Sequence, residues 1–193
     1  MVKKIVILIL LSPLFLSAQE MNDIVAKKGL LRTTGTISFG RMTKEKQTNI
    51  YLQGALEYFV TDNITARGDI YYYLKSGDKQ ILNLNHQLFA GMSYHFGTKS
   101  NFLPYLGIQP GVALTQANFV TIDEKNNLEV SPLISVVGGF NYYASKWFHL
   151  FIEGRYIAGK HLSNQRVITL DEVRLSFGLG FNFNVLKKKT KLD

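Results

Sequence analysis

Apolar and polar residues alternate with a period of two along most of the chain. The clearest segment is 172–185, in which every second residue is apolar and the residues between are polar or glycine; the apolar set is Val173, Leu175, Phe177, Leu179, Phe181, Phe183 and Val185. A period of two is the spacing of a β-strand whose two faces meet different surroundings. This segment therefore predicts a strand with one apolar and one polar face.

Seven further segments show the same alternation: 31–40, 49–60, 64–75, 85–96, 102–115, 128–143 and 147–158. In 64–75 the pattern places Lys75 on the polar face with Arg67 and Asp69. Short connections at 61–63, 97–101 and 144–146 alternate with longer polar loops at about 41–48, 76–84, 116–127 and 159–170. This arrangement predicts an all-β fold, an eight-stranded antiparallel up-and-down barrel over residues 31–185.

The choice between a soluble and a membrane barrel depends on which face points inward. Eight strands enclose a space only wide enough for side chains, so the many Phe and Tyr residues of the apolar face fit poorly inside. Aromatic residues also flank the short turns, as in an interfacial girdle: Tyr58, Phe59, Tyr94, Phe96, Phe102, Tyr142, Tyr143, Trp147 and Phe148. We expect a transmembrane β-barrel with the polar face inside.

The two ends of the chain differ from the barrel segments. Residues 1–18 combine Lys3 and Lys4, an apolar stretch of about twelve residues and the small pair Ser17-Ala18. That stretch is shorter than the roughly 18 residues of a membrane-spanning helix and is typical of a cleaved signal peptide. We expect residues 19–30 to be a periplasmic N-terminal segment and 186–193 a basic C-terminal tail.

Composition excludes several other classes of protein. The chain of 193 residues is 46% hydrophobic and 19% charged and has no Cys, which argues against a disordered chain, a disulfide scaffold or a Cys-ligated zinc module. The net charge of +8 would suit nucleic acid, but Phe and Tyr spread along the whole chain do not suit a basic DNA-binding domain, so no nucleic-acid partner is expected.

The pattern of strands, with the Gly-aromatic closing strand 175–183, resembles the small OmpA/OmpX-type outer-membrane barrels of Gram-negative bacteria. The resemblance implies a monomer in the outer membrane that contacts lipid and lipopolysaccharide and is inserted by the barrel-assembly machinery. It says little about function, because such barrels include adhesins, stabilisers, narrow channels and enzymes. One departure is that Phe183 is followed by a Lys-rich tail, whereas such barrels often end on the aromatic residue that the assembly machinery reads.

Charged residues are expected inside the barrel. The inward set contains five acids and four bases: Arg32, Glu57, Arg67, Asp69, Glu129, Glu153, Arg155, Glu172 and Arg174. A three-residue turn at 61–63 places Glu57 directly opposite Arg67, and we expect these two to pair, because an unpaired charge in a low-dielectric lumen costs several kcal/mol. Arg174 is expected to join Glu153 and Arg155. The set predicts a salt-bridged plug; a narrow pore lined by these charges is the alternative.

One string has a chemical resemblance. His161-Leu-Ser163-Asn164 resembles the His-x-Ser-Asn motif of outer-membrane lipid A deacylases, which would make Ser163 the nucleophile, His161 the base and Glu172 the orienting acid. Gln165 replaces the Ala of that motif, and all three residues share the parity of the inward face, whereas lipid hydrolysis needs the outer face. A polar extracellular loop is the preferred interpretation.

No cofactor or metal is expected from the sequence. The four His residues (His86, His95, His149 and His161) fall in separate segments without metal-ligand spacing, and no Gly-rich phosphate loop is present. We therefore expect a non-enzymatic outer-membrane barrel that acts in envelope integrity or in surface interaction through its loops. A narrow channel for small solutes is the first alternative and a lipid A deacylase the second.

Overall fold

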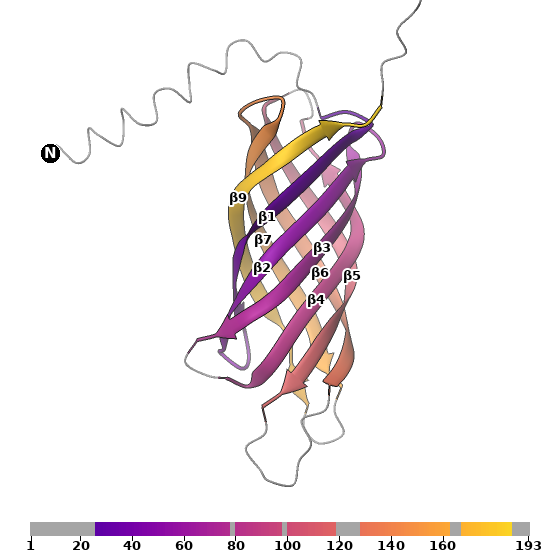
Figure 1. Cartoon of the computed structure of the whole chain (residues 1–193). Helices are drawn as coiled ribbons and strands as arrows, with labels where there is room; N and C mark the ends of the chain where they lie inside the picture. Colours follow the sequence, from indigo (N-terminus) through magenta and orange to yellow (C-terminus); the bar gives the residue numbers. More distant parts are fainter. Residues whose placement is uncertain (1–25, 78–79, 98–99, 119–127, 163–166, 187–193) are drawn as a thin grey trace, which may run out of the picture.

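The computed structural model describes residues 26–77, 80–97, 100–118, 128–162 and 167–186, and they form one closed β-barrel (Figure 1). Its strands are β1 (Leu30–Met42), β2 (Thr48–Phe59), β3 (Ile64–Ser76), β4 (Leu82–His95), β5 (Phe102–Ala117), β6 (Leu128–Tyr143), β7 (Phe148–His161), β8 (Ile168–Thr169) and β9 (Glu172–Asn184). The two-residue β8 pairs only with the end of β7, so the wall has eight strands. Among the described residues, no helix is long and apolar enough to cross a membrane.

Each strand of the wall pairs antiparallel with the next one along the chain, and β1 closes the barrel by pairing with β9. The register between β2 and β3 places Glu57 opposite Arg67, as the three-residue turn predicts. The predicted fold class, an eight-stranded antiparallel up-and-down barrel, is confirmed.

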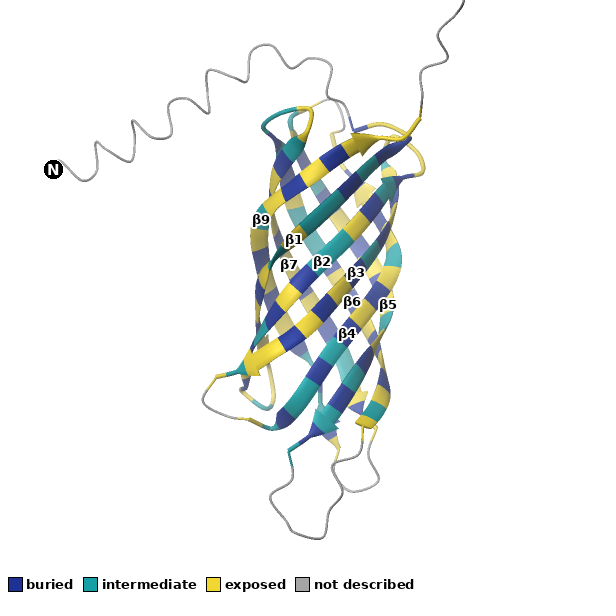
Figure 2. Cartoon of the chain, viewed as in Figure 1, coloured by how far each residue is buried: buried dark blue, intermediate teal, exposed yellow. Residues whose placement is uncertain are grey.

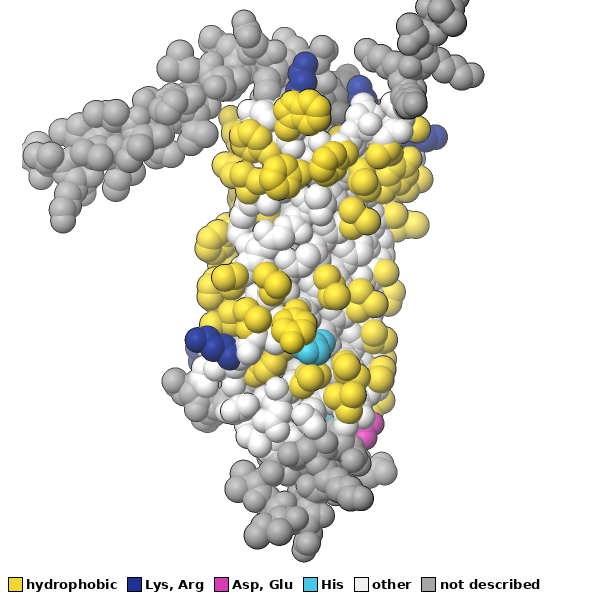
Figure 3. Space-filling model, in the orientation of Figure 1, with side chains coloured by type: hydrophobic (Ala, Val, Ile, Leu, Met, Phe, Trp, Pro, Cys, Tyr) yellow, Lys and Arg dark blue, Asp and Glu magenta, His cyan; other side chains and the backbone are white. Residues whose placement is uncertain are grey.

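Burial alternates along every strand of the wall (Figure 2). In β9, for example, Arg174 and Ser176 are 1% exposed and face the lumen, whereas Val173 and Leu175 are 54% and 47% exposed. Apolar side chains cover much of the outside of the barrel (Figure 3). An apolar outer wall around a polar interior is the arrangement of a barrel whose outside faces lipid.

The connections at the two ends of the barrel differ less in length than the sequence predicts. At the end opposite the termini, residues 43–47 and 77–81 join their strands with five residues each, because β1, β2, β3 and β4 extend further than the alternation indicates. Longer connections join β5 to β6 and β7 to β9. The prediction of four long loops at this end is therefore wrong for two of them.

A β-bulge also changes the orientation of one predicted lumen residue. The register between β2 and β3 shifts between Ile50 and Tyr51, so that Tyr51 lies opposite Tyr73 while Ile50 lies opposite Lys75. A bulge inserts one residue and moves the following side chains to the other face. Lys75 is consequently exposed with Leu74 rather than buried with Arg67, which corrects the prediction from parity.

Two of the aromatic residues assigned to the outer girdle lie inside the barrel. Phe59 and Tyr143 are fully buried, and they pack with Ala26, Leu30 and Leu103 at the end that holds the termini. Trp147, in contrast, is 72% exposed beside the same end, as expected of an interfacial residue. The predicted signal peptide, residues 1–18, lies outside the described residues, as do most of the 19–30 segment and the 186–193 tail.

Candidate functional site: the charged lumen

The lumen contains equal numbers of buried positive and negative side chains. Four Arg residues and four carboxylates are at most 7% exposed: Arg32, Arg67, Arg155, Arg174, Glu57, Asp69, Glu153 and Glu172. The ninth predicted member, Glu129, is only half-buried near the loop end of β6. Buried charges are tolerated in proteins when each has a partner of opposite sign and further hydrogen bonds.

Arg67 lies at the centre of the main network. Its guanidinium donates to both carboxylate oxygens of Asp69, over 2.9 and 2.7 Å, and to Glu153 on the far wall over 2.5 Å. Arg155 completes the network at 2.9 Å from the Asp69 carboxylate. Tyr105 donates to Glu153 over 2.6 Å. These contacts cross the lumen, since they join β3 to β5 and β7.

The pairing partners differ from those predicted. Glu57 lies opposite Arg67 in the register, but its carboxylate accepts from Arg32 on β1 and contacts His95 at 2.8 Å. Arg67 instead binds Asp69 and Glu153. Arg32 also lies directly opposite Glu57, in the register between β1 and β2. Glu57 therefore has an arginine opposite it on each neighbouring strand, and opposition alone does not decide which of the two it binds.

A second network lies nearer the loop end of the barrel. Glu172 accepts from Arg174 over 2.8 and 2.5 Å, from Asn49 over 2.7 Å and from the Tyr51 hydroxyl over 2.8 Å. Gly40 leaves room for this carboxylate, because a Cβ at that position would overlap the Glu172 side chain. Arg174 therefore pairs with Glu172, and the predicted cluster of Arg174 with Glu153 and Arg155 does not form.

Aromatic rings alternate with guanidinium groups across the two networks. Arg174 lies 3.9 Å from the centre of the Tyr51 ring and 4.1 Å from that of Tyr71. Arg155 lies 5.3 Å from the same Tyr71 ring and 4.8 Å from Phe89. Cation–π contacts of this kind stabilise a desolvated guanidinium. Tyr71 and Phe89 have the parity of the inward face, which is the signal in the sequence that could have identified them.

Apolar side chains cover the networks at the loop end. A buried cluster there includes Met42, Tyr73, Leu82, Leu133, Ile157, Ile168 and Leu170, contributed by strands around the barrel and by the β8 region. At the opposite end the cluster around Phe59 and Tyr143 has the same effect, with Ala26 from the N-terminal segment 1% exposed within it. The charged middle of the lumen is thus enclosed between two apolar clusters.

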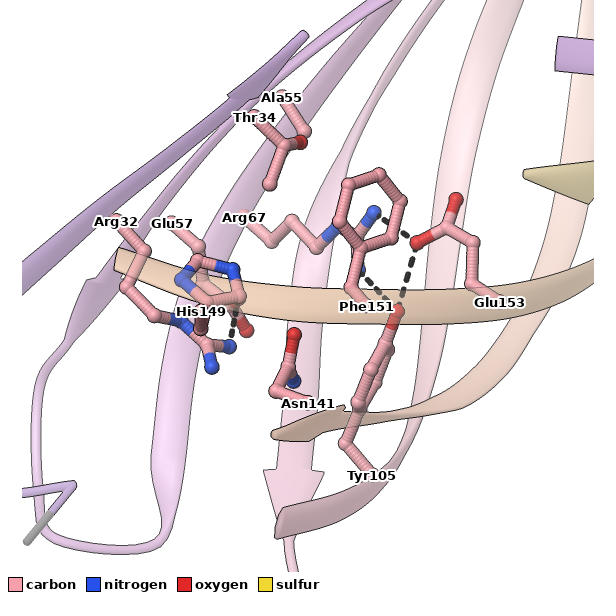
Figure 4. A pocket seen from close by; sticks show the side chains of 10 residues that line it. All are labelled: Arg32, Thr34, Ala55, Glu57, Arg67, Tyr105, Asn141, His149, Phe151 and Glu153. Atoms are coloured by element: carbon pink, nitrogen blue, oxygen red, sulfur yellow. Dashed lines mark hydrogen bonds and ion pairs between the residues drawn. The ribbon is translucent and has the colours of Figure 1, made fainter. Parts of the chain in front are cut away.

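A small cavity lies in the middle of the lumen. Figure 4 shows the residues around a cavity between the Arg32 and Arg67 groups, with Glu57, Glu153 and Tyr105 directed toward it. The cavity has a volume of about 10 Å³, close to the minimum that holds one water molecule. Several polar atoms beside it, including Asn141 Nδ2 and Arg32 Nε, have no protein partner. A single water molecule fits this cavity, but a column of water or a solute does not.

The predicted catalytic residues are not brought together among the described residues. The His161 ring is buried, and its Nδ1 lies 2.7 Å from the Thr115 hydroxyl. Glu172 belongs to the Arg174 network described above, and no hydrogen bond joins it to His161. Ser163 lies outside the described residues. Glu172, the acid predicted to orient His161, therefore binds Arg174 instead.

No metal centre is formed by the part of the chain that the structure describes, since no three His, Asp or Glu side chains are grouped to hold an ion. His149 contacts Asn182 at 2.7 Å, and His95 contacts Glu57. His86 lies on the outer side, stacked on Tyr72 with ring centres 4.2 Å apart.

Solved structures provide the comparison for this barrel. OprG of Pseudomonas aeruginosa aligns with a TM-score of 0.61 at 12% identity, covering 83% of this chain and 98% of that one. Neisserial surface protein A aligns at 0.60 and 16% identity, covering 80% and 96%. The N-terminal barrel domain of Pseudomonas aeruginosa OprF aligns at 0.55 and 18% identity, covering 81% and 98%. No protein-family model matches the sequence, and no curated protein matches it.

The class of the protein follows from the wall, the lumen and these alignments together. The chain has the fold of the small outer-membrane β-barrels, with eight strands, an apolar outer wall and a polar interior. At these identities the alignments establish the fold and not a shared ligand or activity.

Proposed function

We propose that this protein is a non-enzymatic barrel of the Gram-negative outer membrane that is closed to solutes. It would contribute to envelope integrity, or to surface interaction through the connections at its loop end. The observation that carries the proposal is the lumen, in which four Arg and four carboxylate side chains are paired and the cavity between Arg32 and Arg67 has a volume of about 10 Å³. A porin-like function would require a continuous water-filled path, and the paired charges in the middle of the lumen argue against one.

The structure of the lumen supports stability as the role of the charges. Removing one partner of a buried ion pair is strongly destabilising, whereas an open pore would leave its charges hydrated. The cross-lumen contact from Arg67 to Glu153 also ties opposite walls together. The exposed residues described in the connections at the loop end, such as those of 43–47, are then a surface available to an external partner.

The proposal is tested by measuring solute entry into vesicles that contain the refolded protein. Liposome swelling in small sugars should match that of protein-free liposomes, with a heat-dependent shift in gel mobility as proof of folding. Swelling that rises with the amount of folded protein would favour the channel alternative.

The absence of catalysis is tested separately by mass spectrometry of lipid A from cells with and without the gene. We expect identical acylation patterns. Loss of an ester-linked acyl chain that disappears in a Ser163→Ala variant would show a deacylase and overturn the non-enzymatic assignment.

A further inference from the structure

Basic side chains gather on one side of the barrel at the loop end. Four of them, which we name the basic rim, are exposed on β1, on the connection to β2 and on β3: Arg41, Lys44, Lys46 and Lys75. The strand register places Arg41 and Lys75 close together. Arg41 lies opposite Thr48 on β2, and Lys75 lies opposite Ile50, two residues further along the same strand. The bulge between β2 and β3 is what brings Lys75 to this face.

The basic rim borders the apolar outer wall directly. Phe39 precedes Arg41 by two positions on the same face of β1 and is 45% exposed, and Leu74 beside Lys75 is 48% exposed. Two residues of a strand span about 6.6 Å, so these cations lie within one side-chain length of the apolar surface. Figure 3 shows basic side chains at the lower left, immediately below apolar ones. This depth corresponds to lipid headgroups rather than to bulk water.

Most of the basic rim has no internal counter-charge. Lys44 lies 3.7 Å from Asp171, but its side chain is still 65% exposed. Within the described ranges, no ion pair involves Arg41, Lys46 or Lys75. This contrasts with the lumen, where every buried guanidinium contacts a carboxylate. Glu45, between Lys44 and Lys46, and Asp171 offset part of this charge, and the rim still offers a net positive charge to an external anion.

Most of the exposed positive charge lies on one side of the wall, since four of the five exposed Lys and Arg residues described at the loop end belong to the basic rim and the fifth, Lys160, lies on β7. On the opposite side, the described outward-facing residues at the loop ends of β4, β5 and β6 include no Lys, Arg, Asp or Glu: Leu84, His86, Leu114, Leu128 and Val130. A general solubilising role would distribute charge around the whole rim. Concentration on β1 to β3 instead indicates a localised anionic partner.

We infer that the basic rim binds the phosphate groups of lipid A in the outer leaflet of the membrane. Lipid A combines phosphates with acyl chains, and the rim places cations directly beside an apolar wall, so one lipid molecule would contact both. The inference rests on the proposed location, since the loop end must face the outer leaflet, as longer loops do in this class of barrel. It assigns a partner to the outer surface, independently of whether the lumen conducts.

The test is native mass spectrometry of the refolded full chain titrated with lipid A in detergent. The variant R41Q/K46Q/K75Q removes three rim charges, and K27Q/K28Q/K146Q is the matched control that removes three exposed charges at the opposite end. Each cation near a headgroup layer changes affinity by about fivefold, so the rim variant should bind lipid A at least about tenfold more weakly. The control variant should bind as the wild type does.

Binding measurements with dephosphorylated lipid A and with inorganic phosphate also test the inference. Dephosphorylated lipid A should bind the wild type as weakly as intact lipid A binds the rim variant, and inorganic phosphate should not compete. Equal loss of binding in the rim and control variants would overturn the inference, as would full competition by inorganic phosphate, which would indicate a free-anion site. A heat-dependent shift in gel mobility confirms that each variant is folded. Solute flux is measured separately and tests the proposed closed lumen, and its outcome does not change how lipid A binding is interpreted.

Discussion

The inner and outer walls of this barrel are built from the same strands and are stabilised in different ways. On β3, Arg67 and Asp69 face a lumen in which each has specific partners, while the Ile70 side chain is 58% exposed on the outer face and is purely apolar. Directional contacts between buried charges depend on the identity of each residue, whereas contact with lipid depends only on being apolar. The comparison teaches that one residue step along a strand separates a position that tolerates little change from one that tolerates much.

The largest effect is expected when the central network loses its arginine. Arg67→Ala leaves Glu153 without its ion-pair partner and should lower the free energy of unfolding by about 3–5 kcal/mol. Urea unfolding in vesicles, followed by the fluorescence of the single Trp147, measures it. Lys75→Ala on the outer face is the matched control and should leave the unfolding midpoint in place. An unchanged midpoint for Arg67→Ala combined with increased ion flux would contradict the plug.

A charge placed on the outer wall should have the next largest effect. Ile70→Arg puts a guanidinium near the middle of the lipid-facing surface and should cost about 2–4 kcal/mol, while Ile64→Arg at the end of the same strand should cost about 0–1 kcal/mol. The same urea titration compares the two variants. Equal costs at both positions would show that the outer wall does not lie in a bilayer as described.

A smaller effect is expected when charge is kept but ring stacking is lost. Arg174→Lys retains the positive charge next to Glu172 and removes the planar group between Tyr51 and Tyr71, so stability should fall by about 1–2 kcal/mol. Arg41→Lys on the outside should leave stability unchanged. If both variants unfolded at the same urea concentration, the aromatic contacts would contribute nothing to the lumen.

The smallest change in stability is expected when the same substitution, Phe to Leu, is made on the outer and on the inner wall. Phe177→Leu on the outer face should alter stability by no more than about 0.5 kcal/mol, because Leu is equally compatible with lipid. Phe89→Leu inside the lumen removes the ring beside Arg155 and should cost about 1–2 kcal/mol. Equal effects would mean that the interior packs no more specifically than the surface.

The period-two alternation predicts most of the strands and their faces, but it does not predict which side chains pair inside the lumen. The alternation of β9 and the opposition of Glu57 and Arg67 follow from local spacing, because neighbouring strands and a three-residue turn determine both. The contact from Arg67 to Glu153 does not follow, because it crosses the lumen and depends on how the closed barrel brings β3 and β7 face to face. Parity also assigns Lys75 to the wrong face of β3, because a bulge interrupts the period-two pattern without a clear signal in the sequence.

The inner aromatic residues show a different limit. Phe59 and Tyr143 lie next to short turns, where a girdle residue is also expected, and only parity separates the two positions. Residue type favoured the outer face, whereas the structure places both rings in an apolar cluster that closes the lumen. Proximity to a turn was therefore a weaker indicator than position in the alternation.

Single-channel recording of the refolded protein in a planar bilayer tests whether the paired charges close the barrel. A gel-mobility shift on heating establishes that the recorded protein is folded. A folded protein that shows no openings is the predicted result, because paired Arg and carboxylate side chains fill the middle of the lumen and the cavity between Arg32 and Arg67 has a volume of about 10 Å³. Discrete and reproducible openings of constant size would contradict the account and would show that the Arg and carboxylate groups line a conducting path.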